Sequence, residues 1–406
     1  MFRNLSRRAI VAAACAALSL QCPSVAALDG DKILLRGSAS VGYDSNVLHV
    51  ADGLTLPAEL GGPQESDVYY GLGAGVHANL PISRQTIRLD ASATKYWYVN
   101  FKQLDYTGYG GSGAWDWRVG NDWYGTLSAG VTQALTTYSS SVGVYVPSLY
   151  KNYNTLIDVH NALTPRWDLE ASVALSQIRY NEDVSQVNDF NQSTYTVAGR
   201  YTSPAGPVTG AQLSFQKGES PNQPPLGQSV FDNNWEQYTL SALLDWPLTG
   251  HSRLAGNIGY TFRTQASTLP GRGDFNGLSG NLTYTYYLSA RTQLQANLYD
   301  LRGPVSDTTA TYVKTVGLGL SASYQMTGKT TLQANLSASQ QSYLGTNLTT
   351  NEQRKDKLYV AGIGASYQAT RTLSFSAGVT YQPRLSNIQF ASYHDTVASI
   401  GGSIQF

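Results

Sequence analysis

The sequence predicts an all-β fold, namely a transmembrane antiparallel up-and-down β-barrel of about 18 strands, with short periplasmic turns and longer extracellular loops. Three observations predict it. Apolar and polar residues alternate along most of the chain, the connections between alternating runs are short and long in turn, and the chain stops on an aromatic residue, Phe406. Alternation with a period of two indicates a β-strand whose two faces meet different surroundings.

Residues 1–27 are expected to be a signal peptide, and residues 28–406 to form the outer-membrane β-barrel. Three arginines precede an apolar stretch from Ala9 to Leu20, and Ser24 to Ala27 offers small residues for cleavage. We place the cleavage near Ala26 or Ala27. Both cysteines of the chain fall inside this segment. The mature chain is therefore expected to have no disulfide, thiol nucleophile or cysteine metal ligand.

The composition excludes several classes of protein. The chain has 27 basic and 27 acidic residues, so no positive excess exists to neutralise phosphates, and we expect no nucleic acid as a partner. Outside the N-terminal segment no apolar run reaches about 18 residues, which excludes a helical membrane protein. No linker or shift of composition divides the rest of the chain into domains.

The alternating runs can be placed to within about two to four residues at each end. They cover residues 33–50, 66–80, 84–98, 104–118, 122–138, 148–163, 166–181, 191–202, 207–217, 233–246, 252–266, 273–287, 291–302, 309–324, 329–343, 356–367, 371–383 and 392–406. This count of eighteen is even, as a bacterial outer-membrane barrel requires.

The connections differ between the two ends of the predicted barrel. Short turns are expected at 81–84, 120–122, 164–166, 203–207, 247–252, 288–291, 326–329 and 368–371, and longer loops include 51–65, 139–147, 182–190, 218–232 and 344–355. Short periplasmic turns opposite longer extracellular loops are typical of outer-membrane barrels. A soluble β-sandwich gives no reason for such asymmetry.

Each run presents one apolar and one polar face. In the run 309–324, the even positions from Val316 to Tyr324 are apolar, and the odd positions from Thr315 to Ser323 are small or polar. We predict lipid outside the sheet and a water-filled lumen inside it. A closed sheet satisfies every strand edge internally, which lets a polar backbone cross lipid. Eighteen strands leave an aqueous channel, because side chains fill the interior only at about eight strands.

The last run, Tyr393 to Phe406, has a largely apolar even face that ends in Phe406. This ending is typical of the closing strand of an outer-membrane barrel, so we interpret Phe406 as a terminal assembly signal. The barrel-assembly machinery and outer-membrane lipid are the partners that this interpretation predicts.

Charged residues in the runs are assigned to the lumen by parity, because a charge facing lipid at the midplane costs about 2–4 kcal/mol. They could line a constriction and select solutes. Alternatively, they could be ion-paired wall residues without a selective role. The candidates are Arg88, Asp90, Asp158, His160, Glu170, Arg200, Asp245, Arg253 and Arg263.

We expect no catalytic, cofactor or metal site. His160 lies two residues from Asp158 on one face, but no nucleophile is identifiable beside them. The other four histidines are dispersed and show no metal-binding spacing. Asp44, Asn46 and Asp52 could suggest calcium, but no twelve-residue loop with a closing glutamate follows. Tyrosines near strand ends fit membrane-interface girdles, with a saccharide track as the alternative.

Several blocks in the same order resemble the EpsL-type exopolysaccharide-biosynthesis outer-membrane proteins of the β-barrel porin group. The most specific block is Leu244 to Leu254 (LDWPLTGHSRL), and the others are Tyr43 to Gly53, Tyr201 to Gly206, Phe231 to Gln237 and Asp274 to Gly277. The sequence departs from the family pattern at Leu48-His49, where the family tends to Phe-Arg, and at the turn 288–291, which lacks Thr-Pro.

The resemblance implies a conduit for exopolysaccharide export, with a polysaccharide chain and periplasmic export proteins as partners. Alternation and loop lengths by themselves predict only the barrel and its location in the outer membrane. Two other functions stay open. The protein could be a general or substrate-specific nutrient diffusion porin, or, less in keeping with the residues, an outer-membrane enzyme.

Overall fold

The computed structural model describes residues 32–55, 62–136, 148–222, 234–266, 274–303, 310–345 and 353–406. The expected signal peptide, with Cys15 and Cys22, lies outside these residues. No helix among the described residues is long and apolar enough to cross a membrane. Two short 3-10 helices, η2 (Lys102–Leu104) and η3 (Asp183–Asn188), lie in connections between strands.

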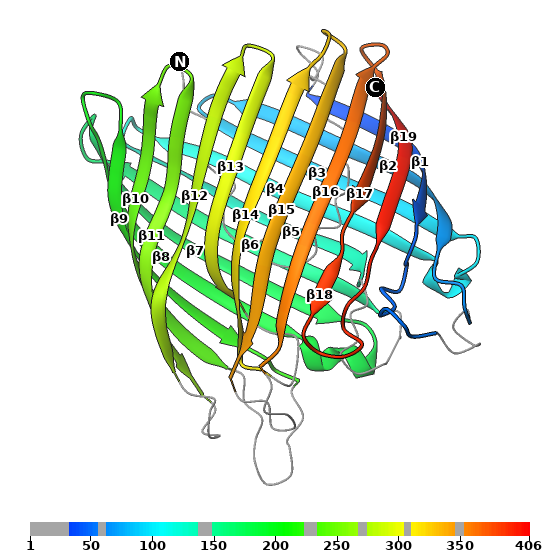
Figure 1. Cartoon of the computed structure of the whole chain (residues 1–406). Helices are drawn as coiled ribbons and strands as arrows, with labels where there is room; N and C mark the ends of the chain where they lie inside the picture. The colour runs from blue at the N-terminus through cyan, green and yellow to red at the C-terminus, as the bar shows by residue number, and fades with distance from the viewer. Residues whose placement is uncertain are drawn as a thin grey trace.

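One antiparallel sheet contains every strand of the described chain (Figure 1). Its strands are β1 (Ile33–Asp44), β2 (Asp67–Ile82), β3 (Gln85–Tyr98), β4 (Tyr106–Val119), β5 (Trp123–Leu135), β6 (Leu149–Ala162), β7 (Trp167–Tyr180), β8 (Phe190–Thr202), β9 (Val208–Glu219), β10 (Trp235–Thr249), β11 (Ser252–Gln265), β12 (Phe275–Ser289), β13 (Thr292–Gly303), β14 (Tyr312–Gln325), β15 (Thr330–Leu344), β16 (Lys355–Gln368), β17 (Leu373–Tyr381), β18 (Arg384–Ser386) and β19 (Thr396–Gln405).

β17 and β18 form a single pass across the barrel, because both pair with β16. The interruption falls at Gln382 and Pro383, and proline has no N–H to donate to a ladder. The nineteen segments therefore make eighteen passes, which confirms the predicted number.

The sheet closes between its first and last strands. β1 pairs with β2 on one edge and with β19 on the other. At the very end of the chain, the backbone N–H and C=O of Phe406 both bond to Leu35. In the middle of this seam the facing residues are small, as in Ser38 opposite Ser403 and Ala39 opposite Gly402. Every edge is thus paired, which a sheet in hydrocarbon requires.

The two rims of the barrel differ as the sequence predicts. The connections after β2, β4, β6, β8, β10, β12, β14 and β16 are tight, and the C-terminus lies at the same rim (Figure 1). We call this the turn rim and the opposite one the loop rim. Short turns are periplasmic in outer-membrane barrels, so the loop rim is extracellular.

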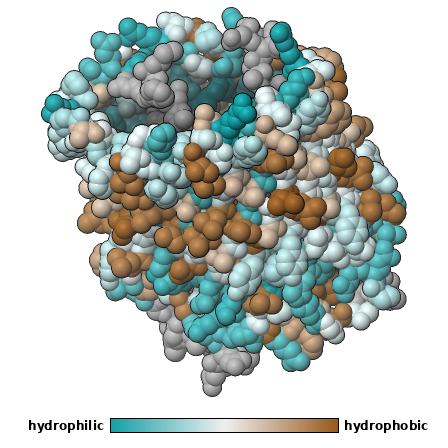
Figure 2. All heavy atoms as spheres, turned by 45° about the horizontal axis from the view of Figure 1, so that its top comes forward, coloured by the Kyte–Doolittle hydropathy of each residue, from teal (hydrophilic) through white to brown (hydrophobic). Residues whose placement is uncertain are grey.

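The faces of the sheet are inverted relative to a soluble protein. Leu336 and Ile363 point outward and are 56% and 68% exposed, whereas Ser241 and Thr261 point inward and are 3% and 1% exposed. Figure 2 shows a brown apolar band between two teal polar zones, and a hollow lined by polar atoms. The predicted arrangement of lipid outside and polar lumen inside is confirmed.

The first strand is shorter than predicted, because residues 45–50 leave the sheet. The Asn46 side chain accepts a hydrogen bond from the Val50 N–H at 2.7 Å and donates one to the Val50 carbonyl at 2.9 Å. This turn brings Leu48 and Val50 against Phe101 and Leu104 in a small apolar cluster. Local hydrogen bonds of asparagine compete with those between strands. The alternation in residues 45–50 therefore predicts a longer first strand than the structure has.

Candidate functional site

All nine predicted charged residues lie on strands and share the face that points into the lumen. Their strand neighbours of opposite parity are the exposed apolar residues of the outer surface, such as Leu89, Ile157 and Leu169. The nine are spread over β3, β6, β7, β8, β10 and β11, so they occupy one side of the barrel wall.

Eight of the nine lie beside an acidic or basic partner near the turn rim, and in two of the pairs the basic member is a histidine. Arg88 Nη2 lies 2.7 Å from Asp116 Oδ2, and Asp90 Oδ1 lies 2.7 Å from His77 Nδ1. Arg253 Nε donates to Asp245 Oδ1 at 2.5 Å across the β10–β11 hairpin. The remaining pairs are Glu170 with Arg200 and Asp158 with His160. These contacts agree with the alternative that such residues are ion-paired parts of the wall.

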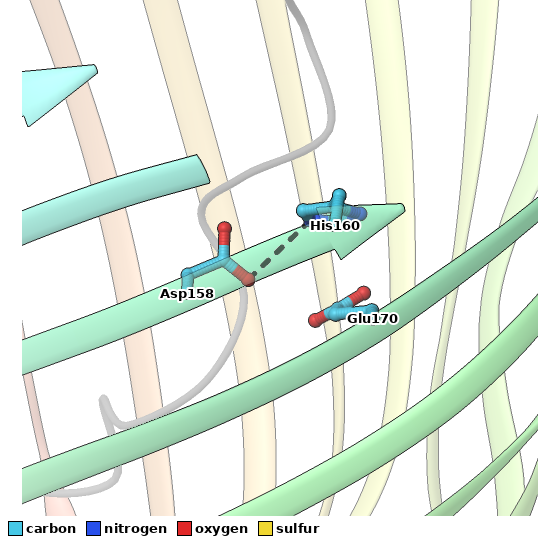
Figure 3. A group of neighbouring side chains, drawn as sticks. All are labelled: Asp158, His160 and Glu170. Atoms are coloured by element: carbon cyan, nitrogen blue, oxygen red, sulfur yellow. Dashed lines mark ion pairs between the residues drawn. The ribbon is translucent and has the colours of Figure 1, made fainter. Parts of the chain in front are cut away.

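The densest group surrounds His160 on β6 and β7 (Figure 3). Asp158 and His160 lie on β6, and register places Glu170 of β7 opposite His160. The His160 Nδ1 atom lies 2.7 Å from Asp168 Oδ1, and its Nε2 atom lies 3.4 Å from Asp158 Oδ1. Asp158 and His160 are only 4% and 5% exposed, so these two side chains are held away from water.

Tyr124 of β5 completes the group. Its ring stacks on His160 with centroids 4.8 Å apart and an angle of 7° between the planes. Its hydroxyl donates to Asp168 Oδ2 at 2.6 Å. Asp168 therefore bonds both the histidine and the tyrosine, which fixes the orientation of the imidazole ring.

Two kinds of chemistry can be assessed at His160. Both ring nitrogens face aspartates, so neither is directed at a hydroxyl nucleophile, as catalysis of the serine–histidine type requires. One ligand atom each from Asp158, His160 and Glu170 lies within 4.8 Å of the others, so these three could hold a divalent cation. Glu170 already pairs with Arg200, which competes with a cation for that carboxylate.

Half a turn away around the barrel, the described inward positions of β14 and β17 between the two rims carry no charge. Inward positions of β14 run from Thr315 through Gly317, Gly319 and Ser321 to Ser323, and those of β17 include Ser374 and Ser376. Figure 1 shows β14–β16 in front of β5–β7, across the lumen. A charged wall with compensated pairs thus faces a wall of small polar residues.

Sequence reasoning missed several partners of the predicted residues. Asp116, Asp168 and Tyr124 are lumen-facing and bond to the predicted group, but they were not singled out. Asp168 has the same parity as Glu170 on β7, so parity alone could have found it. The pairs of interacting side chains are determined by which strands are neighbours and by the register between them.

Arg263 differs from the other eight. It lies near the loop rim of β11, and no acidic group in the part of the chain that the structure describes forms an ion pair with it. Its guanidinium carbon instead lies 3.8 Å from the centre of the Trp235 ring.

The loop between β18 and β19 supplies further charged contacts at the loop rim. Asp395 is fully buried, accepts a hydrogen bond from Gln382 Nε2 at 2.6 Å and lies 3.5 Å from His49 Nε2. Burial raises the pKa of the Asp395 carboxyl, but the contacts with His49 and Gln382 outweigh it and lower this pKa below its ordinary value. Asp44 accepts a hydrogen bond from the Asn46 N–H at 2.9 Å, so it acts as a turn cap at the start of the same loop region.

A closed antiparallel sheet with apolar side chains outward and a polar lumen is an outer-membrane β-barrel. Residues 252–406, from β11 to the end of the chain, match the family described as "Putative beta-barrel porin 2". The match covers less than half of the chain, and the fold is that of an outer-membrane β-barrel, so the predicted location in the outer membrane is confirmed.

Solved structures with a similar fold include proteins of Pseudomonas aeruginosa and Acinetobacter baumannii. OccK2 (OpdF) of Pseudomonas aeruginosa has a TM-score of 0.49 at 10% identity, covering 93% of this chain and 99% of that one. OccAB3 of Acinetobacter baumannii has a TM-score of 0.48 at 11% identity, covering 92% and 99%. The siderophore receptor PirA of Pseudomonas aeruginosa has a TM-score of 0.44 at 12% identity, covering 92% and 80%. No curated protein matches the sequence.

Proposed function

We propose that the protein is a passive diffusion channel for small hydrophilic solutes, and not an enzyme. The observation that carries the proposal is the division of the lumen wall. Compensated ion pairs on β3–β11 face uncharged serine, threonine and glycine positions on β14 and β17. Such a wall offers hydrogen bonds to a passing polar solute without a strong net field that would retain it.

Conductance of the purified full-length barrel in a planar bilayer tests this function. In potassium chloride we expect discrete current steps as single barrels insert. In liposomes, swelling should be fast with small neutral sugars and should slow as sugar size rises. A correctly folded barrel that inserts without any current step would remove the proposal.

Export of an exopolysaccharide is the second candidate, and it is supported by the resemblance to EpsL-type proteins. The most specific block of that resemblance, Leu244 to Leu254, forms the β10–β11 hairpin, whose Asp245 and Arg253 pair inside the lumen. In this function the partners are a polysaccharide chain and periplasmic export proteins. Deleting the gene separates the two candidates: loss of secreted polymer supports export, whereas unchanged polymer with reduced solute uptake supports diffusion.

We also propose that the barrel-assembly machinery recognises the closing strand through Phe406. This side chain is 64% exposed on the outer surface at the turn rim, where its apolar ring is available to a partner before lipid surrounds it. Replacing Phe406 with serine should reduce the amount of folded barrel in the outer membrane, and Phe406→Tyr should retain it. Equal yields of the two variants would contradict this role.

A further inference from the structure

The loop-rim end of β10 and β11 holds Arg263, a cation for which the described residues supply no anionic partner. Arg263 points inward from β11 and is 1% exposed. Register places it beside Gln237 of β10 and Phe275 of β12. Its guanidinium stacks on Trp235, which is itself opposite Gln265.

Polar atoms without hydrogen bonds gather around this arginine. Nε, Nη1 and Nη2 of Arg263 are buried and have no hydrogen-bond partner within the part of the chain that the structure describes, and the same holds for both side-chain polar atoms of Gln265. Trp235 Nε1 and Gln237 Oε1 are also buried and unbonded. The four side chains are adjacent members of one two-strand ladder. Elsewhere on the described lumen wall, Arg88, Arg200 and Arg253 each have a carboxylate.

An isolated buried charge is strongly destabilising, because it loses its hydration without an opposite charge to replace it. The stacking of Arg263 on Trp235 compensates only in part, since cation–π contacts contribute about 2 kcal/mol when desolvated. Buried polar groups in native proteins almost always have partners. The group at Arg263 therefore has the character of a binding site whose hydrogen bonds are completed by a ligand.

The hydrogen-bonding groups around Arg263 indicate which chemical class of ligand the site would bind. A guanidinium presents parallel N–H groups that match the two oxygens of a carboxylate. Trp235 Nε1 adds a donor, Gln265 offers a donor and an acceptor, and Gln237 Oε1 can accept from a hydroxyl. We propose that Arg263, Trp235, Gln237 and Gln265 form a binding site for hydroxylated carboxylates, such as sugar acids, that enter the channel at its extracellular rim. This inference rests on the proposed diffusion function and names its substrate class.

The test uses gluconate and sorbitol, two polyols of the same chain length that differ in the carboxylate. The full-length protein is inserted in a planar bilayer in potassium chloride, and each solute is added on the loop-rim side. Gluconate should reduce the single-channel current in a saturable manner, and sorbitol should not. Arg263→Gln should weaken this block about 10- to 100-fold, because charge-assisted hydrogen bonds are lost. Arg371→Gln, which removes an exposed arginine from a turn, should leave the block unchanged.

The outcomes are distinct. Absence of any current in potassium chloride refutes the channel function itself, whereas current with equal gluconate block in wild type and Arg263→Gln refutes only the binding site. Block by inorganic phosphate without block by gluconate refutes the assignment to carboxylates. If Arg263→Gln fails to fold, as judged by heat-modifiable electrophoretic mobility, Arg263→Lys provides the measurement. It keeps the charge but loses the planar fork, so the block should weaken about tenfold, and an unchanged block would refute the site.

Discussion

His160 and Asp168 are joined by a 2.7 Å contact between Nδ1 and Oδ1, which links β6 to β7 across their hairpin on the lumen side. The contact is one part of a continuous network, since Asp168 also accepts from Tyr124 and His160 also faces Asp158. His160 therefore contacts two carboxylates and an aromatic ring, and these contacts hold the neighbouring strands together.

His160→Ala should destabilise the barrel without closing it. Removing the imidazole takes a hydrogen-bond partner from buried Asp158 and from half-buried Asp168, which costs about 1–3 kcal/mol. The midpoint of urea unfolding in detergent micelles should fall, and single-channel conductance should stay near that of wild type. His160→Gln, which can still donate to one aspartate, should recover part of the stability. Normal stability with lost conductance would instead assign His160 to solute passage.

An arginine should destabilise the barrel on the outer face of a strand but not on the lumen face of the same strand. Leu336 points to lipid near the middle of β15, and Ser337 points to the lumen beside it. Leu336→Arg should reduce the free energy of folding into lipid by about 2–4 kcal/mol, whereas Ser337→Arg should change it little. Equilibrium folding into liposomes measures both. Equal costs at the two positions would contradict the assigned faces.

Gly256 occupies a position in β11 that other residues adopt only with strain. Its φ is +152°, and a Cβ there would lie 2.0 Å from the carbonyl oxygen of Asn281 on β12. Gly256→Ala should therefore destabilise the barrel by at least about 1–3 kcal/mol. The temperature at which the electrophoretic mobility changes from that of the folded barrel to that of the unfolded chain should fall. Gly250→Ala is the matched control in the adjacent turn, since nothing lies within 4 Å of its Cβ.

Acid should release the loop that Asp395 holds. The folded pKa of this carboxyl is lower than its ordinary value near 3.8, so its contribution to stability is complete above that value and is lost as the pH falls through the lowered pKa. Proteolysis near residues 45–55 should be slow at neutral pH and should accelerate below about pH 4. Asp395→Asn should be cleaved faster at neutral pH and should show a weaker acid response. A wild-type rate that is constant across this range would contradict the role of Asp395.

The strands could be predicted from the sequence because the alternation that defines them is local. β15, for example, shows its outward leucines and inward serines within one run, and the turn residues Thr327 and Gly328 mark its start. The errors have local causes that alternation does not reveal. Asn46 bonds Val50 and ends β1 early, and Pro383 interrupts the pass of β17 and β18.

The sequence predicts which face of each strand the candidate site residues occupy, but not which side chains they contact. Parity placed Glu170 and His160 in the lumen, yet only the register of β6 with β7 sets them opposite each other. The contrast between Arg253, which has a carboxylate, and Arg263, which has an aromatic ring, also depends on neighbours from other strands. Such contacts depend on how neighbouring strands are aligned in the sheet and not on the alternation within any one strand.

The small residues that face each other where β1 meets β19 have a consequence for insertion into the membrane. Ser38, Ala39 and Ser40 oppose Ser403, Gly402 and Gly401, so little side-chain surface interlocks there and backbone bonds dominate the junction. Bonds of that type can be exchanged one for one with another exposed strand. At these positions the junction between β1 and β19 can therefore separate and re-form by exchange of backbone hydrogen bonds, without repacking of large side chains.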